Sequence, residues 1–108
     1  MDTQLKRGLL EVCVLAAIRK EDSYGYQIVR DMKQYTEISE STLYPILRRL
    51  EAAQMLTEYS SEHNGRLRKY YRITDAGIER IRSFTEEWHE MDRIYQFITK
   101  GETENDEA

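Results

Sequence analysis

The last third of the sequence carries a repeat that restricts the fold more than any other feature. Six apolar residues follow one another at spacings of 3, 4, 3, 4 and 3 residues: Ile81, Phe84, Trp88, Met91, Tyr95 and Ile98. This heptad spacing predicts one long helix, capped at Thr74 and Asp75 and ending near Lys100, whose apolar seam packs along another helix. A domain of 108 residues buries only about two-thirds of its unfolded surface, so a second subunit is an expected source of that other helix.

The first predicted helix, residues 4–19, also needs more neighbours than one small domain readily supplies. Two apolar stripes run along it, one formed by Leu5, Leu9, Val12 and Ala16 and the other by Leu10, Val14, Ala17 and Ile18. A helix that is apolar on two sides must pack on both of them. Cys13 lies within this apolar run, where a role in the core is far more common than one as a nucleophile.

The same run does not fit a signal peptide or a membrane anchor. Glu11 interrupts it, no A-x-A cleavage site follows it, and it is too short to span a bilayer. A single cysteine excludes a disulfide within the chain, which is typical of proteins from a reducing compartment. We therefore expect a cytoplasmic protein without a membrane segment.

Two shorter helices are predicted in the middle of the first half. The turn KEDS places Asp22 or Ser23 where either could cap a helix over residues 24–35, and Gly25 in that helix would permit a close helix crossing. The stretch STLYPILRRLEAAQML then predicts a third helix. Pro45 favours a start at Ser41 or Thr42 over one at Ser39, although a bent helix would allow the earlier start.

The third predicted helix has two contrasting faces. One face is apolar, with Leu43, Ile46, Leu47 and Leu50 at helical spacing. The opposite face contains only small residues and one arginine, namely Ser41, Pro45, Arg48 and Ala52. A smooth face without acids is unusual in a chain of net charge -4, and it suits a helix that lies against a polyanion.

A two-stranded β-hairpin is predicted after residue 56. LTEYSS and RLRKYYRIT are rich in β-branched and aromatic residues, and EHNG between them is a turn signal. On the second strand, alternation places Arg66, Arg68, Tyr70 and Arg72 on one face and Leu67, Tyr71 and Ile73 on the other. The hairpin therefore combines a basic face with a core face.

The charges are divided unevenly along the chain. Residues 1–74 hold 12 basic and 10 acidic residues, whereas residues 75–108 hold 4 basic and 10 acidic residues. Residues 63–73 contain four basic residues and no acid. The final GETENDEA is expected to be a disordered acidic tail. The predicted organisation is thus a domain over residues 1–74, a dimerisation helix over 75–100 and a tail over 101–108.

Three helices followed by a hairpin predict a winged helix-turn-helix domain, so the fold class is mostly α with a small β-hairpin (α+β). The third helix would enter the major groove of DNA and the hairpin would be the wing. Ser41, Thr42 and Tyr44 could then hydrogen-bond phosphates near the positive end of the helix dipole. Arg48 or Arg49 could read guanine or hold the backbone, although an ordinary solvated pair remains an alternative.

Four segments, in this order and spacing, resemble the PadR family of bacterial transcriptional regulators: MDTQLKRGLLEVCVL, YGYQI, STLYPILRRLE and RKYYRITDAG. The similarity extends from residue 1 to about residue 98 and is greatest to the branch with one short C-terminal helix. It implies a homodimeric repressor whose last helix packs against the first helix of its partner. It also implies DNA contacts by Ser41, Thr42, Tyr44, Arg48 and Arg49, and by Arg66, Arg68 and Lys69 of the wing.

The sequence departs from the family pattern at three positions. Ser41 stands where the family often has glycine, and Leu67 splits the usual run of basic wing residues. Gln54 stands where glycine often ends the recognition helix, which concerns only how that helix terminates.

The only tryptophan, Trp88, lies in the middle of the heptad seam, with Asp92 one turn further along the same side. An aromatic anchor of the dimer interface is the simpler interpretation. Relatives of the short branch that bind drugs imply a second one, in which paired Trp88 rings hold a planar aromatic ligand and Asp92 attracts a cationic group. The residues of this ligand or dimer set are Leu9, Cys13, Ala16, Trp88, Met91, Asp92 and Tyr95.

Enzyme activity is not predicted. His63 and His89 are too scattered for a metal site or a Cys–His pair, and no glycine-rich phosphate loop or nucleophile elbow is present. We therefore expect no catalytic residue, no metal and no cofactor. The alternative to an operator-binding repressor is a winged-helix module whose basic wing binds an acidic protein without specific DNA binding.

Overall fold

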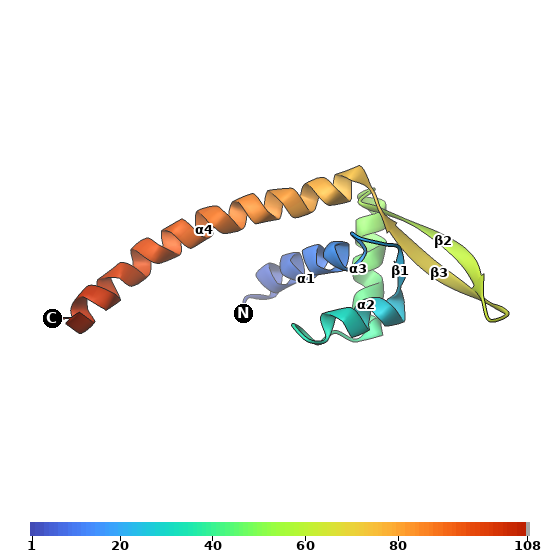
Figure 1. Ribbon diagram of the computed structural model, residues 1–108, viewed down its shortest axis with the longest axis horizontal. Helices are drawn as coiled ribbons and strands as arrows, with labels where there is room; N and C mark the ends of the chain where they lie inside the picture. The colour runs from blue at the N-terminus through green and yellow to red at the C-terminus, as the bar shows by residue number, and fades with distance from the viewer. Residues whose placement is uncertain (108) are drawn as a thin grey trace.

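The computed structural model describes the chain as far as residue 107, and its side chains as far as residue 102. Three helices and a small sheet form a body from which a fourth, long helix projects (Figure 1). The elements are α1 (Thr3–Ala17), β1 (Ser23–Tyr24), α2 (Gly25–Met32), α3 (Glu40–Ala52), β2 (Leu56–His63), β3 (Arg66–Ile73) and α4 (Asp75–Glu107). This is the winged helix-turn-helix arrangement that the sequence predicts, with α2 and α3 as the helix pair and β2–β3 as the wing.

The turn between α1 and α2 differs from the expectation that Asp22 or Ser23 caps α2. Tyr24 occupies the N-cap position without a side-chain capping bond in the described structure, because residues 23 and 24 pair with β3 as strand β1. The Asp22 carboxylate instead binds side chains of the wing, and the buried Ser23 hydroxyl has no hydrogen-bond partner among the described residues.

Helix α3 begins earlier than the favoured start at Ser41 or Thr42. Ser39 is the N-cap, and its side chain accepts a hydrogen bond from the Thr42 amide at 3.2 Å. Pro45 therefore lies inside the helix, where it has no N–H to donate to the Ser41 carbonyl. A capping bond at Ser39 thus outweighs the preference of proline for the first turn.

Helix α3 ends in a Schellman motif centred on Gln54. The Met55 amide donates to the Leu50 carbonyl and the Gln54 amide donates to the Glu51 carbonyl, both at 2.9 Å. Gln54 has a φ of 61°, a left-handed conformation that glycine adopts without strain. The expectation that residue 54 terminates the recognition helix is confirmed. Because residue 54 is not glycine, the left-handed conformation strains its backbone.

The wing belongs to a three-stranded antiparallel sheet of order β1-β3-β2, so the two-stranded prediction lacked β1. β1 was missed because a strand of two residues is too short to show alternation. Asn64 and Gly65, both with positive φ, form the two-residue turn of the wing. The pairing of Tyr59 with Tyr70 and of Ser61 with Arg68 sets the register of the wing. The predicted core face holds only at the base of β3, where Tyr71 is buried; Leu67 is 80% exposed, because the tip of the wing projects beyond the core.

The core lies between α1, α2, α3 and the base of the sheet. Its fully buried side chains include Val14 and Leu15 of α1, Ile28 of α2, Leu43 of α3 and Leu56 of β2. All four apolar residues predicted for the inner face of α3 are buried. This core fixes α3 by one face and leaves its opposite face to solvent.

Helix α4 packs on the body only through its first turns. Ile81 is buried, whereas Trp88, Met91, Tyr95 and Ile98 are 53%, 50%, 62% and 64% exposed. The helix then extends away from the body, and the chain reaches 68 Å along its longest axis (Figure 1). The predicted seam residues therefore lie on one long helix, but from Trp88 onward they are exposed to solvent in a single copy of the chain.

The backbone of α4 continues beyond the predicted end near Lys100 and runs to Glu107. Residues 101–107, where the sequence predicts a disordered tail, are thus part of the helix; residue 108, and the side chains from residue 103 onward, lie outside the described part of the chain. Within the described residues, no helix is long and apolar enough to cross a lipid bilayer.

Candidate nucleic-acid interface

The outer face of α3 forms a ridge of three side chains, Ser41, Pro45 and Arg48, which we call the recognition ridge. Ser41 and Arg48 are exposed and Pro45 is half-buried. At 100° per residue the ridge lies directly opposite the buried face of the helix. Short side chains along most of its length allow the backbone of α3 to approach a partner closely, and Arg48 is the one long cation on it.

The first turns of α3 present a cluster of hydroxyl groups. Ser39 Oγ lies 2.9 Å from Ser41 Oγ and 3.1 Å from Thr42 Oγ1. Ser41 and Thr42 are exposed, at the end of the helix where the dipole favours anions. The cluster can therefore donate hydrogen bonds to phosphate oxygens, as the sequence predicts.

One flank of the recognition ridge faces the wing. Tyr44, Arg48 and Glu51 of α3 line a hollow together with Glu58, Lys69 and Tyr71 of the wing. The Tyr44 hydroxyl packs against Gly25, where an added Cβ would lie 2.8 Å from its oxygen. Gly25 thus permits a close contact between α2 and α3, as expected, and the contact is made to a tyrosine side chain.

The other flank of the recognition ridge faces α1. Arg49 donates to the Glu11 carboxylate from Nε at 3.1 Å, and Arg7 lies 3.8 Å from the same Glu11 oxygen. Arg49 is therefore held toward α1, whereas Arg48 is free to face outward. The two neighbouring arginines, paired in the sequence-based hypothesis, occupy different sides of α3.

The three basic wing residues of the predicted site do not share one face. Strand alternation places Arg66 and Arg68 on one side of β3 and Lys69 on the other. Lys69 lies 3.6 Å from Glu58 and lines the hollow beside α3, whereas Arg66 is exposed next to the turn. The wing can therefore contact a polyanion from its tip and from both of its faces.

Arg68 is supported by a stack of tyrosine rings. Its guanidinium lies 4.0 Å from the centre of the Tyr24 ring, in cation–π geometry. Tyr24 contacts Tyr70 edge to face at 5.7 Å, and Tyr70 stacks on Tyr59 at 5.6 Å. These rings hold Arg68 in one place on the surface, which lowers the entropy that it would lose on binding.

A second cluster, which we call the wing clamp, consists of Asp22, Tyr59 and Arg72. The Tyr59 hydroxyl donates to Asp22 Oδ2 at 2.6 Å, and Arg72 Nη2 lies 3.0 Å from the same oxygen. The Tyr59 hydrogen bond, followed by the Arg72 hydrogen bond and charge, lowers the pKa of Asp22, while partial burial opposes this shift. The clamp ties the wing to the α1–α2 turn and occupies Arg72, and no sequence motif pointed to it because its members are 37 and 50 residues apart.

The predicted ligand or dimer set is only partly brought together in one chain. Leu9, Trp88 and Met91 line a common groove between α1 and α4, together with Leu5 and Phe84. Cys13 packs against the core, and desolvation there raises the pKa of its thiol, which keeps it protonated. Ala16, Asp92 and Tyr95 lie outside the residues that line the groove; the Asp92 carboxylate accepts a hydrogen bond from Gln96 Nε2 at 3.0 Å.

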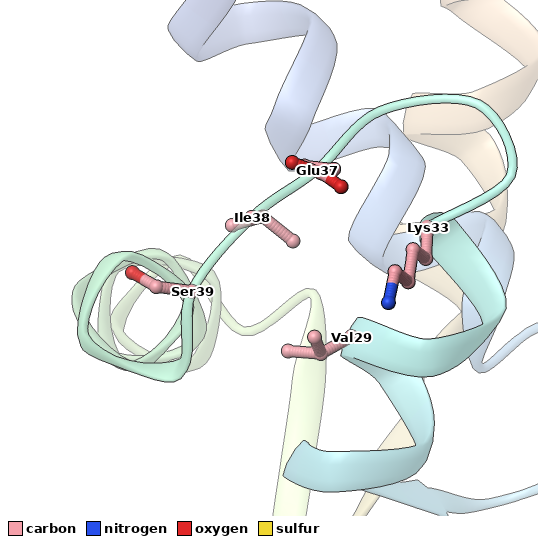
Figure 2. A pocket seen from close by; sticks show the side chains of 5 residues that line it. All are labelled: Val29, Lys33, Glu37, Ile38 and Ser39. Atoms are coloured by element: carbon pink, nitrogen blue, oxygen red, sulfur yellow. The ribbon is translucent and has the colours of Figure 1, made fainter.

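A further hollow lies between the end of α2 and the start of α3. Figure 2 shows Val29 and Ile38 at its apolar floor, with Lys33 and Glu37 at its edge and Ser39 beside it. Its cation and its anion offset each other, so the hollow has no preference for an anionic partner. Among the described residues, no three of the His, Cys, Asp and Glu side chains gather in a way that could hold a metal ion.

Comparisons with known proteins agree with this geometry. Residues 14–83 match the family described as "Transcriptional regulator PadR-like family". The structure of smu.1704 from Streptococcus mutans UA159 is 44% identical and has a TM-score of 0.77, over 88% of this chain and 90% of that one. A PadR family transcriptional regulator from Eggerthella lenta DSM 2243 is 35% identical with a TM-score of 0.76, over 88% and 86% of the two chains.

The fold is also similar to that of a protein solved with DNA. Bacillus subtilis PadR, in complex with operator DNA, is 24% identical with a TM-score of 0.67. The match covers 71% of this chain and 46% of that chain.

Proposed function

Since this chain belongs to the PadR-like family of transcriptional regulators, we propose that it is a homodimeric repressor that binds an inverted-repeat operator and is released by a small-molecule effector. Residues 1–74 would bind DNA and residues 75–100 would join the two subunits. Such a protein acts where the chromosome is, in the bacterial cytoplasm.

The observation that carries the proposal is the recognition ridge, which has the wing along one side and α1 along the other. An α-helix enters a major groove about 12 Å wide only if its outer face is narrow, as that of α3 is. In this proposal Arg48 on the ridge would read guanine, while Ser41, Thr42 and Tyr44, which are all exposed, would bind phosphates. Bacillus subtilis PadR, which is similar in fold, was solved in complex with operator DNA, and this supports the proposal of operator binding.

The exposed seam of α4 supports the homodimer. Its four residues from Trp88 to Ile98, namely Trp88, Met91, Tyr95 and Ile98, are 50% to 64% exposed. A continuous apolar stripe of this kind marks an interaction surface. Packing of α4 on α1 and α4 of a second copy would cover the seam and the groove that Leu9, Trp88 and Met91 line.

The same groove is our candidate for the effector site. Trp88 is 53% exposed and stacks near Phe84, with ring centres 6.4 Å apart, so a planar aromatic compound could be held against its free face. Asp92 would attract a cationic group if its carboxylate turned from Gln96 toward the ligand. Tryptophan fluorescence tests this directly, because Trp88 is the only tryptophan of the chain. Saturable quenching by planar cationic compounds would support the site, and unchanged emission across the panel would exclude it.

The alternative is a protein-interaction module whose wing binds an acidic protein. The two functions differ in sequence preference and in salt dependence. We expect saturable binding to the DNA upstream of the protein's own gene that resists random competitor DNA. This binding should weaken with salt, with log K falling by about 0.9 per neutralised phosphate for each tenfold rise in salt concentration. Binding no tighter than to random DNA, together with retention of an acidic protein by the wild type but not by Arg68→Ala/Lys69→Ala, would favour the alternative.

A further inference from the structure

We propose that the cleft between the first turns of α1 and the side of α3 is a second phosphate-binding surface, through which Lys6 and Arg7 hold the DNA backbone. The cleft is lined by Lys6, Arg7 and Leu10 of α1 and by Thr42, Pro45 and Arg49 of α3. This inference rests on the proposed DNA binding and extends it to a helix outside the helix-turn-helix pair and the wing.

The position of the cleft follows from the geometry of α3. At 100° per residue, Thr42 and Arg49 lie on one side of the recognition ridge, and Tyr44 and Glu51 lie on the other. A helix seated in the major groove has a sugar-phosphate backbone along each side. The wing side of α3 faces one of these backbones, so the α1 cleft faces the other.

The balance of charge favours the α1 side. The wing-side hollow pairs two cations, Arg48 and Lys69, with two acids, Glu51 and Glu58. The α1 cleft has three cations, Lys6, Arg7 and Arg49, and no acid among the described residues that line it. Thr42, at the positive end of α3, also lines this cleft. The more positive flank of the recognition ridge is thus the one that no wing residue reaches.

Glu11 positions the arginines of this cleft. Its carboxylate lies 3.1 Å from Arg49 Nε and 3.8 Å from Arg7 Nε, and its side chain is 26% exposed, against 36% and 50% for the two arginines. One acid therefore holds two guanidinium groups and partly neutralises them. The other acid near the start of α1, Asp2, is its N-cap and accepts the capping hydrogen bond from the Gln4 amide at 3.0 Å.

The test is the salt dependence of DNA binding by Lys6→Gln/Arg7→Gln. A labelled random-sequence duplex of about three helical turns is titrated by anisotropy between about 50 and 200 mM salt, because backbone contacts do not depend on sequence. We expect the slope of log K against log salt to become shallower by about 4, one for each lost contact, because each of the two subunits loses two contacts. Arg82→Gln/Arg93→Gln removes the same charge from the side of α4 away from its seam and is expected to leave the slope unchanged.

A second variant tests the inference in the opposite direction. Glu11→Gln keeps the shape of the side chain and frees both arginines, so we expect tighter binding and a steeper slope, a gain that misfolding cannot mimic. A double variant with wild-type slope and wild-type dimer mass, or a Glu11→Gln slope no steeper than wild type, would overturn the inference. Failure of the wild type to prefer its own upstream DNA over random DNA would instead refute the proposed repressor function.

Discussion

Replacing Gln54 by glycine should stabilise this protein, although the substitution removes a side chain. Gln54 ends α3 with a φ of 61°, in the left-handed region where a Cβ atom crowds the following carbonyl. Its side chain is exposed, and the contacts it makes to the rest of the fold come from its backbone: the amide donates to Glu51, and the carbonyl accepts from Thr74 Oγ1 at 2.7 Å. Glycine preserves both bonds and removes the crowding.

The magnitude follows from two opposing terms. A left-handed conformation costs a non-glycine residue roughly 1–2 kcal/mol. Glycine loses more backbone entropy on folding, by roughly 0.5–1 kcal/mol. The free energy of unfolding of Gln54→Gly should therefore rise by about 0.5–1 kcal/mol, which for a chain of this size corresponds to about 2–5 °C in Tm.

Thermal and urea unfolding followed by circular dichroism measure this effect, at one fixed protein concentration because the proposed dimerisation would contribute to Tm. Gln54→Ala is the matched control, since alanine retains the Cβ atom and should not be more stable than the wild type. Gln54→Asn should fall between glycine and glutamine, because asparagine tolerates this conformation. Equal stability of the glycine and alanine variants would refute the assignment of strain to residue 54.

Three further changes test other parts of the account. Gly77→Ala should lower the free energy of unfolding in urea by about 1–3 kcal/mol, because a Cβ there would clash with the Met55 carbonyl oxygen and lie 2.6 Å from Ile73 Cγ1. The control is Gly101→Ala, where a Cβ would meet nothing within 4 Å in the described structure; it should be neutral or slightly stabilising. Asp22→Asn should lower the free energy of unfolding at neutral pH, and its difference from the wild type should shrink as pH falls below about 4. The pKa of Asp22 is lower in the folded than in the unfolded state, so its ionised form stabilises the fold above the unfolded pKa, and this stabilisation is lost as pH falls through the folded pKa. A difference that does not change with pH would exclude the charge as the cause. Met91→Glu should convert the proposed dimer to monomer in sedimentation equilibrium, because it puts a charge into the apolar seam; an unchanged dimer mass would place the interface elsewhere.

The features that the sequence predicted well have strong periodic signals. The inner face of α3, the alternation along β3 and the seam of α4 each repeat several times, so single exceptions do not hide them. The special position of Gln54 followed from the resemblance to the PadR family, in which glycine often ends this helix. The outer face of α3 could be predicted from the same helical periodicity, since a helix that packs on the core by one face exposes the opposite face.

The features that the sequence could not show depend on contacts between distant residues. The sequence predicted Asp22 as a helix cap, because aspartate is a preferred N-cap residue. Its contacts with Tyr59 and Arg72 depend on how the wing packs against the α1–α2 turn, which the sequence does not show. Arg48 and Arg49 are neighbours in the chain, and only the position of Glu11 on α1 separates their roles. Strand alternation could have separated Lys69 from Arg68, but not shown which face of the wing lies beside α3.

The central claim is that two copies of this chain place two α3 helices in successive major grooves. Selection of bound duplexes from a random library tests it most directly. The account predicts enrichment of an inverted repeat whose half-site centres lie about 34–36 Å apart, or a multiple of that distance. With Arg48→Ala, it predicts that the base preference is relaxed at one position in each half-site. Enrichment of a single unrepeated site, or no enrichment over the starting library, would contradict it.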